Sequence, residues 1–222
     1  MAVLDVPSPT RHLSRRLSLS IRGMHRRLPM STCSVPAPAL CDAGVAAWVR
    51  AHGVTVFVAG ADELQRTCYA GIRAEHIVLR CGVDTSTIRA AVAAGVTRFV
   101  VSSDRHVDVL ASTDRPEIAV YLDEAGPAVI GERRLAVIGL HAAVDDGAGA
   151  VEWGMAAERL LCRTAILRTC GLPLARIFLT GGDVSGWLHS GAAVAGEVDD
   201  ALTEGCARWR LARPSVLLGA AT

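Results

Sequence analysis

The stretch VAAWVRAHGVTVFVAG, residues 45–60, predicts a helix that ends at a glycine and is followed at once by a buried strand. Gly53 stands where a helix C-terminus favours a residue that adopts a left-handed backbone. The run after it, 54–59, is continuously apolar rather than alternating, which is typical of a strand covered on both faces. Such a strand belongs to a parallel sheet with helices packed on it.

The same arrangement recurs along the rest of the chain. Apolar, β-rich runs predict strands, and segments with helical spacing separate most of them. Asp62 and Asp84 stand where helix N-caps belong, and Gly71, Gly95 and Gly171 follow predicted helices. The predicted strands are 32–35, 54–59, 76–80, 98–102, 118–122, 135–140, 176–180 and 215–218. The predicted helices are 40–51, 62–70, 84–94, 104–111, 151–170 and 192–207.

This succession of strands and helices predicts an α/β fold, a (βα)8 barrel of the TIM type. An open, doubly wound sheet is the competing architecture, but no G-x-G-x-x-G motif follows an early strand. The connection 123–134 is too short for a full crossover helix, so we expect the barrel to be abbreviated between its fifth and sixth strands. Residues 1–10 are expected to form a flexible tail, and residues 11–222 a single domain.

Composition limits the function. The chain has 222 residues, of which 51% are hydrophobic, and a net charge of +1, which favours a globular protein and gives no case for nucleic-acid binding. No apolar run approaches the roughly 20 residues of a membrane-spanning helix, so no membrane association is expected. All 23 basic residues are arginine. Without a lysine, Schiff-base chemistry on a side chain is excluded.

The seven cysteines are scattered, with no C-x-x-C pair. They predict reduced thiols in a cytoplasmic protein rather than disulfides or a zinc site. The arginine- and serine-rich segment 11–27 also resembles an organelle transit peptide. However, the apolar residues from Leu13 to Leu28 follow helical spacing, so we expect a surface helix with one apolar stripe.

Five stretches form an ordered set along the chain. They are GVTVFVAGADELQRTCYAGIRAEHIVLRCG (53–82), IRAAVAAGVTRFVVSS (88–103), VIGLHAAV (137–144), IFLTGGD (177–183) and ARPSVLLGAAT (212–222). This set resembles the alanine-racemase-like barrel domain of the fold-type III pyridoxal-phosphate (PLP) decarboxylases, which include the diaminopimelate, ornithine and arginine decarboxylases. The likeness covers about residues 20 to 222, and the helix–strand block at 40–103 carries most of it.

The resemblance implies four requirements at the end of the barrel where the strands finish. A lysine at the end of the first strand holds PLP as an imine, and the second histidine of a G-L-H-x-H motif stacks on the pyridine ring. Glycine N–H groups cradle the phosphate. A glutamate placed against the pyridine nitrogen lets the ring act as an electron sink.

This chain departs from that pattern at nearly every position. Pro36 stands at the end of the first strand, in place of the lysine. His141 matches the first histidine of G-L-H-x-H, but Ala143 stands at the second. Gly181 and Gly182 match two of the three phosphate-binding glycines. The other departures are Asp145 and Asp146 for Gly-Ser, Asp183 for the third glycine, Gly219 for the glutamate, and Ala221 and Thr222 for Gly-Arg.

These departures predict a degenerate, non-catalytic paralogue of the PLP-dependent decarboxylases, either a regulatory or interaction protein or the product of a decaying gene. No cofactor is expected, because the amine is missing and three aspartates would repel a phosphate. PLP stays open only as a non-covalent ligand, as in a single-domain barrel like the PLP-homeostasis proteins. Gly181, Gly182 and His141 would then line the degenerate cofactor site.

A second function stays open, in which the old cofactor site takes a small anion or a divalent cation. Asp145, Asp146 and Asp183 follow neighbouring strands and form a candidate metal set near His141. Arg80, at the end of the third strand, is expected to form an outward-facing salt bridge. The resemblance also implies a second, β-rich domain that this sequence does not contain, so an intact paralogous decarboxylase is the expected partner.

Overall fold

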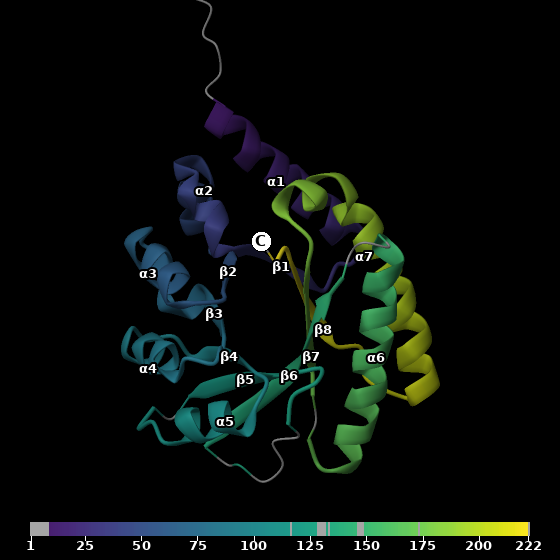
Figure 1. Cartoon of the computed structure of the whole chain (residues 1–222). Coiled ribbons are helices and arrows are strands. Elements are labelled where there is room, and N and C mark those ends of the chain that lie inside the picture. The colour runs from purple at the N-terminus through teal and green to yellow at the C-terminus, as the bar shows by residue number, and fades with distance from the viewer. Residues whose placement is uncertain are drawn as a thin grey trace, which may run out of the picture.

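The computed structural model describes residues 9–115, 117–127, 132, 134–145, 149–172 and 174–221. Its strands are all parallel and close into one barrel in chain order, with β8 paired to β1. Figure 1 looks along this barrel and shows the helices arranged around its outside. The closed barrel confirms the predicted (βα)8 fold and excludes the open sheet.

Each of the eight predicted strands is present within a few residues of its expected limits. β6 is the longest, and it continues four residues beyond the predicted end at residue 140. The strands are β1 Ser31–Pro36, β2 Thr55–Val58, β3 Ile77–Arg80, β4 Arg98–Val101, β5 Ile118–Asp123, β6 Leu135–Val144, β7 Arg176–Gly181 and β8 Ser215–Gly219. Because all of them run in one direction, their last residues meet at one end of the barrel, which we call the mouth.

The helices cover the outside of the barrel. Gly53 ends α2 with a φ of 62°, a left-handed conformation that side chains with a Cβ rarely adopt. None of the described helices is both long and apolar enough to span a membrane. The α-helices are α1 Pro9–Arg27, α2 Ala43–His52, α3 Ala61–Tyr69, α4 Thr85–Ala93, α5 Asp104–Ala111, α6 Ala150–Thr169 and α7 Val184–Trp209, and two short 3₁₀ helices are η1 Ala37–Cys41 and η2 Ala74–His76.

Helix starts differ from the predictions in several places, and α2 begins at Ala43 rather than at residue 40. Asp62 lies inside α3, whose N-cap is Gly60, whereas Asp84 caps α4 as predicted by accepting the Ser86 N–H. α7 begins at Val184 rather than at residue 192, because the Asp183 carboxylate accepts a hydrogen bond from the Gly186 N–H at 2.6 Å. The serines and glycines in this first part of α7 have weak helix propensity, which hides the true start in the sequence.

The connection between β5 and β6 confirms the predicted abbreviation. Its described residues, 124–127, 132 and 134, include no helix. Arg163 of α6 donates hydrogen bonds to the carbonyl oxygens of Asp123 at 2.8 Å and of Gly126 at 2.7 Å. The α6 helix therefore holds the turn that follows β5.

Two apolar clusters pack against the strands, one outside the barrel and one inside it. The larger one lies between the barrel and its helices, and includes Leu17, Met24 and Leu28 from the predicted stripe on α1, which packs against α7 and α2. The smaller one fills the inside of the barrel with side chains from six strands: Phe57, Val78, Val100, Tyr121, Phe178 and Leu217. This interior packing gives the mouth a solid floor.

Candidate functional site

The end of β1 faces the inside of the barrel. Pro36 is the last residue of β1 and pairs with Phe57 of β2, whose ring belongs to the interior cluster. Residues paired in register share a face of the sheet, so Pro36 is on the interior side. Its φ of −73° and ψ of 146° start η1 directly after the strand. The position that the resemblance assigns to the lysine therefore lies at the mouth and is occupied by a buried proline.

His141 is the centre of a buried polar network. Its Nδ1 lies 3.1 Å from Asp123 Oδ2, and its Nε2 lies 3.0 Å from Thr180 Oγ1. The imidazole is fully buried and contacts the rings of Phe57 and Phe178 at centroid distances of 5.9 and 5.0 Å. Both ring nitrogens are thus occupied by neighbouring side chains, and none is left to contact a ligand.

The protonation of this network follows from burial. Burial lowers the pKa of His141 more than the hydrogen bond and charge of Asp123 raise it, so the imidazole is neutral. Its Nδ1–H then donates to Asp123 and its Nε2 accepts the Thr180 hydroxyl proton. Burial alone would raise the pKa of Asp123, but His141, the Ala125 N–H and Arg80 outweigh it and hold that pKa below its usual range.

Unfolding should therefore become easier in mild acid. His141 and His106 have folded-state pKa values lowered by burial from the ordinary 6.5, so the unfolded chain binds more protons below that pH. The free energy of unfolding should be at its full value above about pH 6.5 and should fall below it, by at most about 1.4 kcal/mol per pH unit for each histidine. The lowered pKa of Asp123 adds a further loss at lower pH. Urea titrations at several pH values measure this effect; a midpoint that rises between pH 7.5 and 5 would contradict it.

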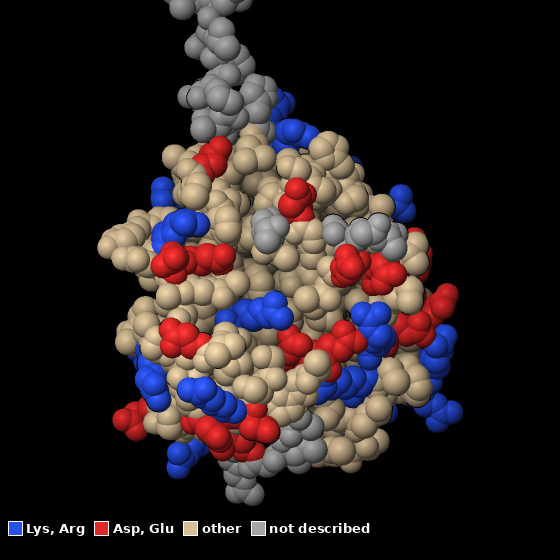
Figure 2. All heavy atoms as spheres, in the orientation of Figure 1, with Lys and Arg blue, Asp and Glu red and all other residues tan. Residues whose placement is uncertain are grey.

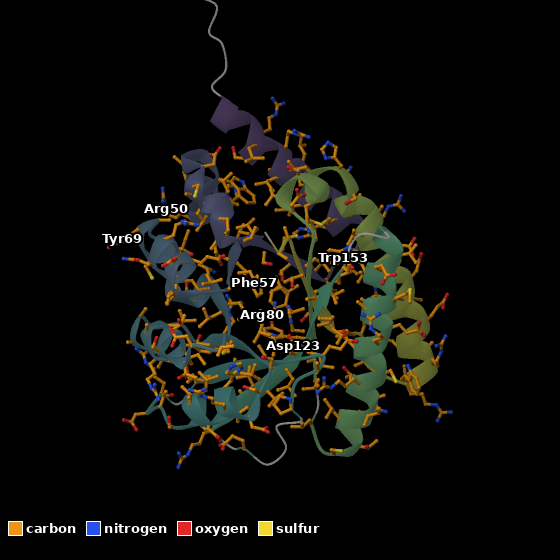
Figure 3. The ribbon with its side chains drawn as sticks, in the orientation of Figure 1. Arg50, Phe57, Tyr69, Arg80, Asp123 and Trp153 are labelled. Atoms are coloured by element: carbon orange, nitrogen blue, oxygen red, sulfur yellow. The ribbon has the colours of Figure 1, made fainter. Side chains whose placement is uncertain are left out.

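Arg80 faces the mouth and does not form the predicted outward salt bridge. Its guanidinium lies 4.0 Å from Asp123 Oδ2, although β3 and β5 are separated by β4. Figure 3 places Arg80, Asp123 and Phe57 close together inside the ring of strands, and Figure 2 shows adjacent basic and acidic groups at that place on the surface. Arg80 points inward because it lies two residues after Val78, whose side chain is inside the barrel, and alternate residues of a strand share a face.

A hollow of about 590 Å³ lies at the ends of β2, β3 and β4, beside Arg80 and Arg105. His106 supports its wall, because its Nε2 lies 3.0 Å from the Gly82 carbonyl oxygen and its Nδ1 accepts the Ser102 N–H at 3.3 Å. These bonds need a neutral imidazole, in agreement with the burial that lowers the pKa of His106. The hollow therefore presents two arginines on a wall that His106 holds together.

The two matching glycines lead into α7. Gly181 is buried at the end of β7, and an added Cβ there would lie 2.6 Å from the Val144 carbonyl oxygen. Gly182 follows with a φ of 59°. Asp183 then places its own carboxylate on the helix N-terminus, where it accepts the Gly186 N–H. The Asp183 carboxylate thus occupies a backbone N–H that would otherwise be free to bind a phosphate.

Gly219, which stands where the resemblance places the glutamate, has no room for a side chain. A Cβ built on it would lie 1.9 Å from Ser34 Oγ on the neighbouring strand β1. Ser34 is itself buried, and its hydroxyl has no hydrogen-bond partner among the described residues. A carboxylate at position 219 would therefore require Ser34 to move or to be replaced.

The candidate metal set is only partly visible. Asp145 is exposed just after β6, Asp183 caps α7, and Asp146 lies outside the described residues. Within the described part of the chain, no group of three or more histidine, cysteine or acidic side chains is arranged to hold a metal ion. The set of Asp145, Asp146 and Asp183 stays a prediction.

The sequence did not single out Asp123 or Thr180 as functional candidates. Both face the inside of the barrel near the mouth, where they bind His141. The available signal was weak: each is a polar residue at or near the end of a predicted apolar strand, and such positions collect at the mouth of a parallel barrel.

Solved structures with the same barrel include amino-acid decarboxylases. The match to ornithine decarboxylase from Entamoeba histolytica has a TM-score of 0.74 at 13% identity, and covers 93% of this chain and 63% of that one. Lysine/ornithine decarboxylase from Vibrio vulnificus, complexed with cadaverine, gives 0.75 at 16%, covering 93% and 61%. Arginine decarboxylase from Paramecium bursaria Chlorella virus, bound to agmatine, gives 0.73 at 12%, covering 93% and 62%.

The chain has the barrel fold of these decarboxylases. It spans about three fifths of the length of the matched structures, and identities of 12–16% establish the fold alone. No family model matches the sequence, and no curated protein matches it. The resemblance to the fold-type III PLP-dependent decarboxylases is thereby supported at the level of three-dimensional structure, and their barrel is the part that this chain shares.

Proposed function

We propose that this chain is a degenerate, non-catalytic relative of the PLP-dependent decarboxylases that acts as a regulatory or interaction protein. One observation carries the proposal: the end of β1, where an amine must hold the cofactor, is occupied by inward-facing Pro36, and no lysine occurs elsewhere in the chain. The residues of the mouth do not fit covalently held PLP.

Two further contacts support the proposal. Asp183 covers the start of α7 with a carboxylate, which repels a phosphate dianion. Ser34 fills the space beside Gly219, so no carboxylate faces the position of the pyridine nitrogen. Restoring the decarboxylase reaction would therefore require substitutions at no fewer than three positions, which are Pro36, Asp183 and Gly219.

Incubation with PLP followed by borohydride reduction tests this proposal. Because the chain has no lysine, its α-amino terminus is the one aliphatic primary amine that can react. We expect mass spectrometry of the digested protein to find the pyridoxyl group on the N-terminal peptide or nowhere. Release of CO2 from ornithine, lysine, arginine or diaminopimelate in the presence of PLP would overturn the proposal.

A second candidate function is the binding of a small anion at the mouth, including non-covalent PLP. Arg80, with 45% of its side chain exposed, and Arg105 line the 590 Å³ hollow and favour it. Calorimetry with inorganic phosphate on the unaltered protein and on Arg80→Gln measures this binding.

The alternative ligand is a divalent cation held by Asp145, Asp146 and Asp183. If neither Mg²⁺ nor Mn²⁺ gives heat in calorimetry or a shift of the melting temperature, this metal site is excluded.

An intact paralogous decarboxylase is the partner that we propose. This chain covers 63% of the ornithine decarboxylase structure, and a partner of this kind would supply the portions of such an enzyme that lie outside the matched region. The seven unpaired cysteines support action in a reducing compartment such as the cytoplasm. Mixing the purified chain with a decarboxylase from the same genome should give a complex of higher mass on size-exclusion chromatography; separate elution at micromolar concentration would argue against it.

A further inference from the structure

A second cavity, of about 560 Å³, lies at the opposite end of the barrel from the mouth. Its walls come from α1, α2 and the first residues of several strands, so we call it the basal cavity. The strand residues at its rim are Thr32, Thr55, Arg98, Arg176 and Ser215. The volume lies within the roughly 300–1,000 Å³ that is usual for small-molecule sites.

Every charged side chain that lines the basal cavity is basic. Arg22 of α1, Arg98 of β4 and Arg176 of β7 line it, together with His25 and His52, and no acidic residue does. Among the described residues no carboxylate forms an ion pair with Arg22, Arg98 or Arg176. The lining of the cavity therefore carries a net positive charge.

Arg98 and Arg176 approach one another from strands that are not neighbours in the barrel. Burial lowers the pKa of Arg98 and the charge of Arg176 lowers it further, whereas Tyr121 and Glu75 raise it by less. The Arg98 guanidinium donates to the backbone carbonyl oxygen of Glu75, whose carboxylate in turn lies 3.2 Å from Arg73. Two like charges thus lie near one another, and among the described residues no carboxylate is in ion-pair contact with either, so an anion that joins them would be favourable.

Tyr121 adds a phenol side chain to the lining of the basal cavity. The residue is 98% buried, lines the basal cavity beside Arg98, and has its ring packed on Phe178 at 5.5 Å. It acts on the Arg98 guanidinium, whose pKa it raises. Apolar side chains, among them Ile21, Trp48 and Leu217, form another part of the wall beside the serines and threonines.

We propose that the basal cavity is a binding site for a small organic dianion, either a phosphate monoester or a dicarboxylate, with an apolar body. The guanidinium groups of Arg98 and Arg176 bind the anionic head, since their planar N–H donors match its oxygens. Tyr121 donates its hydroxyl proton to the same head, and the apolar wall contacts the body. This site is separate from the mouth and does not depend on the function proposed there.

Isothermal calorimetry with phenyl phosphate and with phthalate tests the proposal and distinguishes the two kinds of head. At least one of them should bind, and binding should weaken as NaCl is raised from low to physiological concentration. Neutral benzyl alcohol should bind at least about tenfold more weakly than the better anion. No measurable binding of either anion at low salt would overturn the proposal.

Variants separate the basal cavity from the mouth. Arg176→Gln removes an exposed charge from the basal rim and should weaken binding about tenfold or more. Tyr121→Phe removes only the hydroxyl and should weaken binding about threefold to tenfold. Arg89→Gln, on the exposed surface of α4, is the matched control and should bind like the unaltered protein. Loss of binding in Arg105→Gln with none in Arg176→Gln would place the anion at the mouth and overturn the proposal.

Discussion

Replacing Pro36 by lysine should convert a protein without a reactive side-chain amine into one that forms a borohydride-stable adduct with PLP at residue 36. The register of β1 with Phe57 directs this position to the inside of the barrel. Burial disfavours an ammonium ion, so the new amine should have a lowered pKa and should be more nucleophilic at neutral pH than an exposed lysine. Each unit by which the pKa of this lysine falls raises the fraction of reactive, neutral amine at pH 7 about tenfold, and the rate of modification should rise with it.

The matched control is Arg89→Lys, which places a lysine on the exposed surface of α4. Pro36→Lys should be modified at least about tenfold faster than this control at pH 7, as measured by the mass of the digested protein over time. It should still release no CO2 from a basic amino acid, because Ser34 and Gly219 leave the pyridine nitrogen without a carboxylate. Equal rates in the two variants would mean that position 36 does not face the mouth.

Replacing His141 by alanine should lower the free energy of unfolding by about 3–5 kcal/mol. The substitution removes a fully buried ring and leaves the Asp123 carboxylate, of which 14% is exposed, without its closest donor. It also leaves the buried Thr180 hydroxyl without its acceptor at 3.0 Å. Urea unfolding followed by circular dichroism at pH 7.5 measures the loss.

Two comparisons identify the cause of that loss. Thr180→Val keeps the shape of the side chain but removes one hydrogen bond, so it should cost about 1–3 kcal/mol. His25→Ala, on the exposed side of α1, should change stability by less than about 0.5 kcal/mol. If His141→Ala proved no more destabilising than His25→Ala, the buried network would not contribute to the fold.

The strands and most helix limits could be predicted from the sequence because their signals are local. Continuous apolar runs, capping aspartates and glycines after helices act within a few residues of one another. The sequence also shows directly that the chain has no lysine and that a proline stands at the end of β1. These two facts predict that the mouth has no amine to hold the cofactor. The start of α7 was missed because its cap, Asp183, is followed by weak helix formers.

The network around His141 could not be predicted, because it depends on strand register. Between Val120 and Tyr121 the pairing of β5 with β6 shifts by one residue, and this shift brings Asp123 opposite His141. Without it, Asp123 would pair with Leu140 and its carboxylate would have no imidazole to bind. The basal cavity depends in the same way on the closure of the barrel, which brings Arg98 and Arg176 together from separate strands.

The sequence by itself therefore determined the order of strands and helices and the lack of an amine for the cofactor. Only the tertiary structure decided that Arg80 turns inward, that Ser34 fills the space beside Gly219, and that Arg98 and Arg176 meet at the base of the barrel. The physical reason is the range of the forces involved. Helix caps and apolar periodicity act between near neighbours in the chain, whereas register and barrel closure are set by contacts between residues far apart in sequence.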